Sequence, residues 1–350
     1  MVDNYKPAGD SLGSTTRRRF LATTGTATGL AVGFAGCLGD DDEFVLDANA
    51  AGAEGTVHGD VSRLVGDIVE EETGGQIQIN SFTDGELGDL IESIENVAAG
   101  DLDIYVNVYG LAAALYPDAQ VLDTPYMYDD DRPYEHMIEV SQREAVQDLI
   151  EDIADETGMR SLGTFPQGTR RVTIAGDAAT NPEEMSEKLL RAVPVPVFEE
   201  SVAGIGAQVT ELEWGEVPQA LATGQVDGQE NPYDVMVGAG IHEHTDYVIE
   251  TDHMHPAMAF WINDDLWNEF SADQQDIFYE AIEEAQPQAI DQLEETIEEN
   301  KQVFRDEGAE ILEPDDIEFD AFRSRTREHI REQFPDWVDT IEEIMGEEYR

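Results

Sequence analysis

Apolar and polar residues alternate with two different periods along most of this chain. A period of two, typical of strands, marks 44–50, 76–82 and 102–108. Apolar residues at helical spacing fill the segments in between, over 61–69 and 87–97. The pattern therefore predicts alternating strands and helices from residue 44 onward.

The same alternation continues through the centre of the chain. It predicts a helix near 133–157, followed by strands at 161–165 and 171–176. Asn181-Pro182-Glu183-Glu184 combines an N-cap residue, a first-turn proline and an acidic third residue, a combination that begins a helix. From about residue 271 the chain is mainly helical and very acidic. This order predicts an α/β fold with mostly parallel sheets flanked by helices, and a ligand at the carboxyl ends of strands or between domains.

The composition allows two domains and is strongly acidic. The 350 residues are 41% hydrophobic, and 78 Asp and Glu residues face 19 Lys and Arg residues, for a net charge of −59. Only Lys6, Lys188 and Lys301 are lysines. Molar salt shortens the Debye length to about 3 Å and screens such self-repulsion, so we interpret the chain as halophilic; an acidic protein with arginine-rich codon bias is the alternative. The charge excludes nucleic acid and anionic lipid surfaces as partners, since both bind basic patches.

The N-terminal segment resembles an export signal with a lipid attachment site. Residues 16–21, "TRRRFL", resemble a twin-arginine signal, and the apolar run that follows is too short and too polar for a spanning helix. "FAGC" at 34–37 resembles a lipobox, and Cys37, the only cysteine, can form no internal disulfide. We therefore predict that 1–36 is removed, that a lipid on Cys37 anchors the protein to the outer face of the cell membrane, and that 37–43 is an acidic tether.

Positive charge is scarce in the central part of the chain. No lysine or arginine lies between Arg191 and Lys301, and Arg170, Arg171, Lys188 and Arg191 supply the central cations. Arg191 stands among leucines and valines in "LLRAVPVPVF", so we expect it to be partly buried and to need an anionic partner. That partner is either an internal carboxylate or the carboxylate of a ligand, which a guanidinium can bind through two parallel hydrogen bonds.

Several segments resemble the substrate-binding proteins of tripartite ATP-independent periplasmic (TRAP) transporters, of the DctP type. The resemblance runs from about 44 to 312. Its most specific segment is "ELEWGEVPQALATGQVDGQENP", and it also includes "FTDGELGDLIESIENVAAGDLDI", "QVLDTPYMY", "GTRRVT", "LLRAVPV" and "WINDDLWNEFSADQQDIF".

The resemblance implies a two-domain fold like that of periplasmic binding proteins, with a ligand cleft between two lobes and one long helix spanning both. The first lobe would comprise 44–167 plus about 257–296, and the second 168–256 plus about 297–345. Proteins of this family close over a small organic acid and deliver it to TRAP membrane subunits. The implied function is therefore that of an extracytoplasmic receptor without catalytic activity, cofactor or bound metal.

The resemblance also implies ligand-binding residues. Arg191 matches the arginine that pairs with the ligand carboxylate, and Arg170 matches a second ligand-facing arginine. Asn231, in the polar turn "TGQVDGQENP", matches an asparagine that helps to hold the carboxylate, while Trp214 matches an aromatic residue that packs over the ligand. Asn49, after the first strand, is a further candidate. The ligand itself stays open among C4-dicarboxylates, keto acids and sugar acids.

Two other functions compete with the receptor. His242, His244, His253 and His255 form two His-x-His pairs, which on strands would point to one face and suit zinc or copper. They favour a metal-binding surface lipoprotein, although histidines replacing lysines on an acidic surface explain the same cluster. A secreted hydrolase is the second alternative, but the predicted strands and helices from residue 44 onward contain no GxSxG elbow, and 242–246 fails the HExxH pattern at its last position.

Because like charges repel, we expect the fold to depend on salt. Lowering the salt from molar concentration to about 0.1 M lengthens the Debye length to about 10 Å and should loosen or unfold the chain. Circular dichroism melts across this range test the expectation. A melting temperature that is independent of salt contradicts it.

Overall fold

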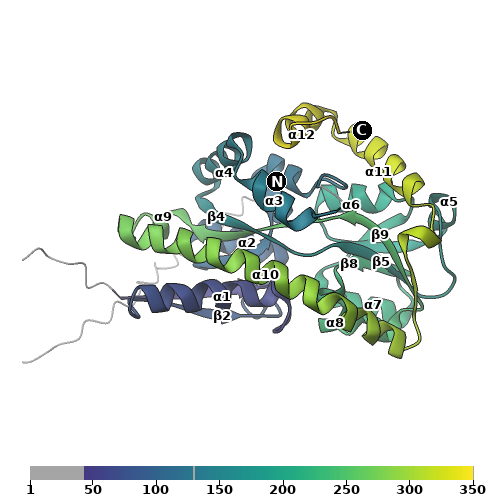
Figure 1. Cartoon of the computed structure of the whole chain (residues 1–350), viewed down its shortest axis with the longest axis horizontal. Coiled ribbons are helices and arrows are strands. Elements are labelled where there is room, and N and C mark those ends of the chain that lie inside the picture. The colour runs from purple at the N-terminus through teal and green to yellow at the C-terminus, as the bar shows by residue number, and fades with distance from the viewer. Residues whose placement is uncertain (1–42, 129–130, 350) are drawn as a thin grey trace, which may run out of the picture. The chain divides into compact units, whose positions relative to one another are not determined.

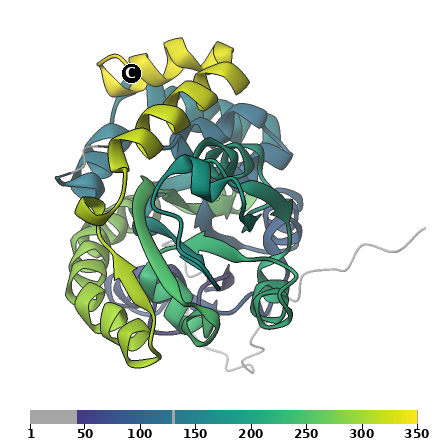
Figure 2. The ribbon, with the colours of Figure 1, turned by 90° about the vertical axis from the view of Figure 1, so that its right-hand side faces the viewer.

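The computed structural model describes residues 43–128 and 131–349, and Figures 1 and 2 show the ribbon from two directions. In this part of the chain the strands form two sheets. The first sheet has the order β2-β1-β3-β10-β4, with the bounds β1 Phe44–Ala50, β2 Ile77–Phe82, β3 Ile104–Val108, β4 Met159–Pro166 and β10 Ala257–Asn263. The second has the order β11-β9-β5-β8-β6-β7, with the bounds β5 Arg170–Ile174, β6 Leu189–Ala192, β7 Gln208–Glu211, β8 Gly228–Asn231, β9 Tyr247–Met254 and β11 Glu310–Leu312.

Helices flank both sheets. The α-helices are α1 Val57–Glu72, α2 Leu90–Ala99, α3 Pro133–Ser141, α4 Glu144–Thr157, α5 Pro182–Met185, α6 Pro196–Gly204, α7 Val217–Thr223, α8 Tyr233–Gly238, α9 Asp264–Trp267, α10 Ala272–Asp306, α11 Phe319–Gln333 and α12 Val338–Met345. Short 3-10 helices are η1 Tyr109–Ala114, η2 Pro117–Asp123, η3 Trp214–Glu216, η4 Ile241–His244, η5 Pro314–Asp316 and η6 Pro335–Trp337. None of the helices within the described ranges combines the length and the apolar character that a membrane span needs.

Each sheet is parallel except around one strand. β10 runs antiparallel to β3 and β4, and β5 runs antiparallel to β8 and β9. These two strands follow the crossings between the sheets, since the chain leaves β4 for β5 at 167–169 and leaves β9 for β10 at 255–256. The predicted α/β fold with mostly parallel sheets is confirmed, and the two reversed strands are the feature that the sequence pattern did not reveal.

The predicted single helix near 133–157 is wrong, because the chain forms α3 and α4 instead. Arg143 between them is extended, with φ −73° and ψ 146°. Ser141 Oγ donates to Ile138 O at 2.8 Å, and Gln147 Nε2 donates to Ser141 O at 2.7 Å. These side chains satisfy carbonyl groups that a continuous helix would have paired with backbone N–H groups, and so they allow the helix to end here.

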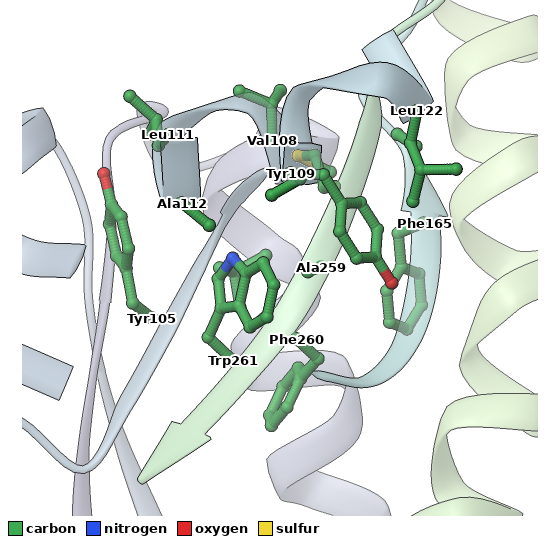
Figure 3. Packing of buried hydrophobic residues seen from close by; sticks show 14 of the residues in the cluster. Tyr105, Val108, Tyr109, Leu111, Ala112, Leu122, Phe165, Ala259, Phe260 and Trp261 are labelled. Atoms are coloured by element: carbon green, nitrogen blue, oxygen red, sulfur yellow. The ribbon is translucent and has the colours of Figure 1, made fainter. Parts of the chain in front are cut away.

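Side chains that alternate along the strands build the core. β10 is buried along its whole length, and its Trp261 meets Tyr109 edge to face with ring centroids 5.2 Å apart, within the cluster shown in Figure 3. In the second sheet, the neighbours Val248 and Ile249 on β9 point to opposite faces. Ile249 packs on the side of α6 and α11, and Val248 packs on the side of α7 and α8. Helices therefore cover the second sheet on both faces.

The longest helix, α10, contacts elements of both sheets. It packs against α1 and β4 near the first sheet and against α8 and β11 near the second, along the path seen in Figure 1. Gln286 Nε2 donates to Thr164 O of β4 at 2.9 Å, and Lys301 Nζ lies 2.8 Å from Glu250 Oε1 of β9. One helix thus joins the two sheets, as the family resemblance implies.

Gly228 begins β8 at a point where the strands approach too closely for a side chain. A Cβ atom there would lie 1.9 Å from Thr173 O and 2.9 Å from Leu190 Cδ2. Since the carbonyl belongs to the neighbouring strand β5, Gly228→Ala should lower the free energy of unfolding by about 1–3 kcal/mol. Gly215→Ala is the matched control, because a Cβ at Gly215 meets nothing within 4 Å. Denaturant unfolding in molar salt compares the two variants, and equal stabilities contradict this packing.

Candidate functional site

Three of the residues that the sequence indicated meet at one edge of the second sheet. Arg170 is the first residue of β5, Arg191 is the third residue of β6, and Asn231 is the last residue of β8. β8 runs parallel to β6 and antiparallel to β5, so the ends of β6 and β8 share this edge with the beginning of β5. Ligands of α/β proteins commonly bind beyond the carboxyl ends of parallel strands.

The edge faces a cavity of about 30 Å³. The second sheet and its loops contribute Arg170, Arg191, Val193, Phe198, Trp214, Asn231 and Val235 to the wall. The opposite wall comes from the end of β3, the segments after β1 and β3 and the first turns of α1 and α2. It comprises Ala51, His58, Leu90, Asn107, Val108 and Leu111. Gln167, also in the wall, lies in the crossing from β4 to β5. Such a volume holds a few water molecules, so an organic ligand enters only when the walls move apart.

Arg191 is buried, and none of the described carboxylates forms an ion pair with it. Its side chain is 1% exposed, its Nε donates to Leu212 O at 2.8 Å, and its Nη2 is buried without a hydrogen-bond partner. Within the described ranges no carboxylate oxygen lies within 4.0 Å of its nitrogen atoms. Burial lowers the pKa of Arg191 to about 10, although Glu230 at longer range favours the charged form. The guanidinium is therefore cationic at neutral pH, with donor capacity to spare.

Arg170, in contrast, has an internal carboxylate partner. Its Nε and Nη2 donate to the two carboxylate oxygens of Glu230, the second at 2.7 Å, and its Nη1 donates to Gln167 Oε1 at 2.9 Å. The guanidinium also lies over the ring of Phe198, 5.0 Å from the centroid. The sequence left two partners open for a buried arginine, an internal carboxylate or a ligand carboxylate. Arg170 is paired with an internal carboxylate, whereas Arg191 is an unpaired cation at the cavity.

Asn231 and Trp214 complete this side of the wall. Asn231 Nδ2 donates to Gln229 Oε1 at 2.6 Å, which fixes the orientation of its amide at the end of β8. Trp214 lies under Arg191, with the guanidinium carbon 5.7 Å from the ring centroid. Trp214 is partly exposed and packs against two of the hydrophobic clusters, so its ring is held in place beside the cation.

Asn49 does not lie in the wall of the cavity. It is fully buried, and its Nδ2 donates to Ser93 Oγ at 2.9 Å and to Gly88 O at 3.3 Å. Its Oδ1 accepts from Leu87 N at 3.4 Å. The side-chain amide of Asn49 is thus hydrogen-bonded to the loop before α2 and to the first turn of α2. Leu90, a residue of the cavity wall, is the first residue of that helix.

The sequence reasoning missed three polar residues of the wall. His58 lies in the first turn of α1, and burial lowers its pKa to about 4, against the opposite effect of the Val106 backbone, so the ring is neutral at neutral pH. Asn107 is the penultimate residue of β3, and its position near a strand end was a signal that could have found it. The side-chain amide of Gln167 contacts Arg170 at one end and His58 at the other. Nothing in the local sequence indicates that Gln167 lies in the wall.

The four clustered histidines serve different parts of the structure. His242 and His244 lie in η4, so this pair does not stand on a strand. His253 Nε2 lies 3.2 Å from Glu230 Oε2, and His255 Nδ1 lies 3.0 Å from Thr169 Oγ1. Over the described part of the chain, no group of three or more His, Cys, Asp or Glu residues could hold a metal ion.

Comparison with known proteins assigns the family. Residues 48–336 match the family described as bacterial extracellular solute-binding protein, family 7, or DctP. The chain belongs to this family. As a DctP protein it is an extracytoplasmic solute-binding protein of the TRAP type, and the family consists of binding proteins rather than enzymes. The metal-binding and hydrolase alternatives find no support in this assignment.

Individual relatives extend over most of this DctP chain. The ectoine-binding periplasmic protein TeaA of Halomonas elongata is 27% identical over 284 residues, which cover 80% of this chain and 82% of TeaA. The sialic acid-binding periplasmic protein SiaP of Vibrio cholerae is 25% identical over 262 residues, covering 75% and 80% of the two chains. A solved TRAP periplasmic solute-binding protein from Roseobacter denitrificans, with bound L-galactonate, gives a TM-score of 0.77 at 24% identity, covering 86% of this chain and 99% of that one. The likeness to this structure shows the two-lobe fold.

Proposed function

We propose that the protein captures an organic acid through Arg191 and delivers it to the membrane subunits of a TRAP transporter. The observation that carries the proposal is the buried guanidinium of Arg191, whose Nη2 has no partner among the described groups. A buried charge without a counter-ion is costly, and a ligand carboxylate bound by two parallel hydrogen bonds would remove that cost. TeaA, SiaP and the galactonate-bound protein are named for carboxylate compounds, which supports the same chemistry here.

The neighbouring residues have separate proposed roles. Asn231 donates a second hydrogen bond to the carboxylate, and Trp214 packs over the bound acid beside Arg191. Arg170 contributes positive potential from the wall while it stays paired with Glu230. Asn49 acts indirectly, because its hydrogen bonds hold the loop that carries Leu90.

Uptake requires two lobes that separate and close. We propose the bounds expected from the sequence, 44–167 plus about 257–296 for one lobe and 168–256 plus about 297–345 for the other. The cavity between the two sets of strand ends is too small for an organic acid as it stands. Opening at the crossings would admit the acid, and closure would exclude water and strengthen its hydrogen bonds with Arg191.

The proposal includes a membrane anchor outside the described residues. The twin-arginine segment, the lipobox and Cys37 all lie in 1–42, and the sequence alone supports their roles. A lipid on Cys37 would hold the receptor at the outer face of the membrane, close to the transporter subunits. The acidic segment 37–43 would serve as the tether.

Replacement of Arg191 tests the binding role. Arg191→Lys keeps the charge but loses the planar fork, so affinity for the acid should fall at least about tenfold, and Arg191→Ala should lower it further. Ligand affinity is measured by calorimetry in molar salt, where long-range steering is screened. Arg63→Lys, on the exposed face of α1, is the matched control and should bind as the parent does.

The stability of the same variants separates binding from structure. If Arg191 only binds ligand, Arg191→Ala should melt in the absence of ligand at least as high as the parent, since the variant loses a buried unpaired charge. A large drop in melting temperature together with normal ligand affinity would make Arg191 structural and sink the proposal.

Cys37→Ser tests the anchor. The variant should be exported but released from the membrane, because serine cannot carry the thioether-linked lipid. Cell fractionation followed by immunodetection distinguishes the two locations. A variant as firmly membrane-bound as the parent rules out the lipid on Cys37 and leaves the binding role untouched.

A further inference from the structure

The wall of the cavity limits the solute to one carboxylate, an inference that rests on the function proposed above. Two arginines line the wall, and Arg170 already donates to both carboxylate oxygens of Glu230. Arg191 alone of these two has no carboxylate within 4.0 Å in the described chain. A second carboxylate on the solute would therefore be buried without a cationic partner. The charges of the wall fit a monoanion.

A cationic group on the solute would also lack a partner. No aspartate or glutamate stands among the described residues of the wall. The carboxylate of Glu230, behind Arg170, is taken up by Arg170 and by His253. Glu213, beside Trp214, has a buried carboxylate oxygen without a hydrogen-bond partner, but it is not part of the wall. An ammonium or amidinium group at the wall itself would lose its hydration without touching a counter-ion, so the wall disfavours a zwitterion.

The neutral polar residues of the wall, Asn107, Gln167, Asn231 and His58, each already have a hydrogen-bond partner within the protein. Asn107 Nδ2 donates to Tyr105 Oη at 2.6 Å, and its Oδ1 accepts a backbone N–H at 2.9 Å. Gln167 Oε1 accepts from Arg170, and its Nε2 lies 3.3 Å from His58 Nδ1. Among these neutral side chains, His58 has a buried Nε2 without a hydrogen-bond partner. A polyhydroxylated acid would have to compete with these internal bonds, and each hydroxyl group left unpaired would carry a cost.

The remaining wall is apolar and comes from both sheets. It comprises Ala51, Leu90, Val108, Leu111, Val193 and Val235, with the rings of Phe198 and Trp214 beside the arginines. We propose that the solute is a small monocarboxylate with a branched or otherwise apolar body and at most about two hydroxyl or oxo groups. Its carboxylate binds Arg191, its body fills the apolar wall, and a single polar group can reach His58.

A panel of four acids tests this solute class by calorimetry on the full chain in molar salt. The probes are 2-hydroxyisovalerate, succinate, L-galactonate and ectoine, which represent the branched monocarboxylates, the dicarboxylates, the polyhydroxylated acids and the zwitterions. We expect 2-hydroxyisovalerate to bind at least about tenfold more tightly than each of the others. Equal or tighter binding of any other probe, or no measurable binding of 2-hydroxyisovalerate, overturns the proposed class.

A nearly isosteric variant tests the apolar wall directly. Val235→Thr places a hydroxyl in the wall at almost unchanged volume, so affinity for 2-hydroxyisovalerate should fall about threefold or more. Val237→Thr lies on the same helix α8 but outside the wall, and it should bind as the parent does. Unchanged affinity in Val235→Thr also overturns the proposed class.

Arg191→Ala distinguishes a failure of the proposed solute class from a failure of the proposed receptor function. If another probe binds better and its binding depends on Arg191, the organic-acid receptor stands and the branched monocarboxylate class falls. If the tightest probe binds equally well without Arg191, the proposed receptor function itself falls.

Discussion

The buried ion pair of Arg170 with Glu230 ties together the strands on which the site is built. Arg170 begins β5, Glu230 lies in the neighbouring strand β8, and His253 of β9 approaches the same carboxylate at 3.2 Å. Burial raises the pKa of Glu230, but the charge and hydrogen bonds of Arg170 and His253 prevail and hold it at about 2. Glu230 is therefore an anion at neutral pH, and it neutralises Arg170. Its pairing is the reason that the unpaired positive charge at the cavity belongs to Arg191.

The same region contains the connections about which the cavity would open if the proposed lobes separate. The two crossings are bonded to each other, since Gln167 N donates to Pro256 O at 3.1 Å and Thr169 Oγ1 lies 3.0 Å from His255 Nδ1. Burial lowers the pKa of His255 to about 3, so this contact is made by a neutral ring. The long helix α10 adds a third link through Lys301, which is buried against Glu250. The proposed separation of the walls would involve these contacts.

The charge of the chain is distributed in a way that suits capture of an anion. Aspartate and glutamate make up 78 of the 350 residues, yet none of the described residues in the wall of the cavity is acidic. At molar salt the repulsion between the outer carboxylates and an incoming anion acts over only about 3 Å. The proposed binding would then depend on short-range contacts inside the cavity, where Arg191 is buried.

The sequence by itself determined the features that depend on neighbours along the chain. Strands and caps follow from local periodicity and local hydrogen bonds, as at Asn181, whose Oδ1 accepts from Glu183 N and Glu184 N at 3.0 Å. Burial of Arg191 could be inferred because its apolar neighbours occupy one short segment. The family resemblance further indicated Arg170, Arg191, Trp214 and Asn231, which line the cavity, and Asn49, which does not.

Only the tertiary structure decided which of these residues are free to bind. Arg170 and Glu230 are 60 residues apart, and the antiparallel pairing of β5 with β8 brings them together. Asn49 is likewise occupied by Ser93, 44 residues further along the chain. His58 enters the wall because α1 starts beside the crossing that carries Gln167. Each of these partnerships joins strands or helices distant in sequence, so its energy depends on packing that no local pattern of residues encodes.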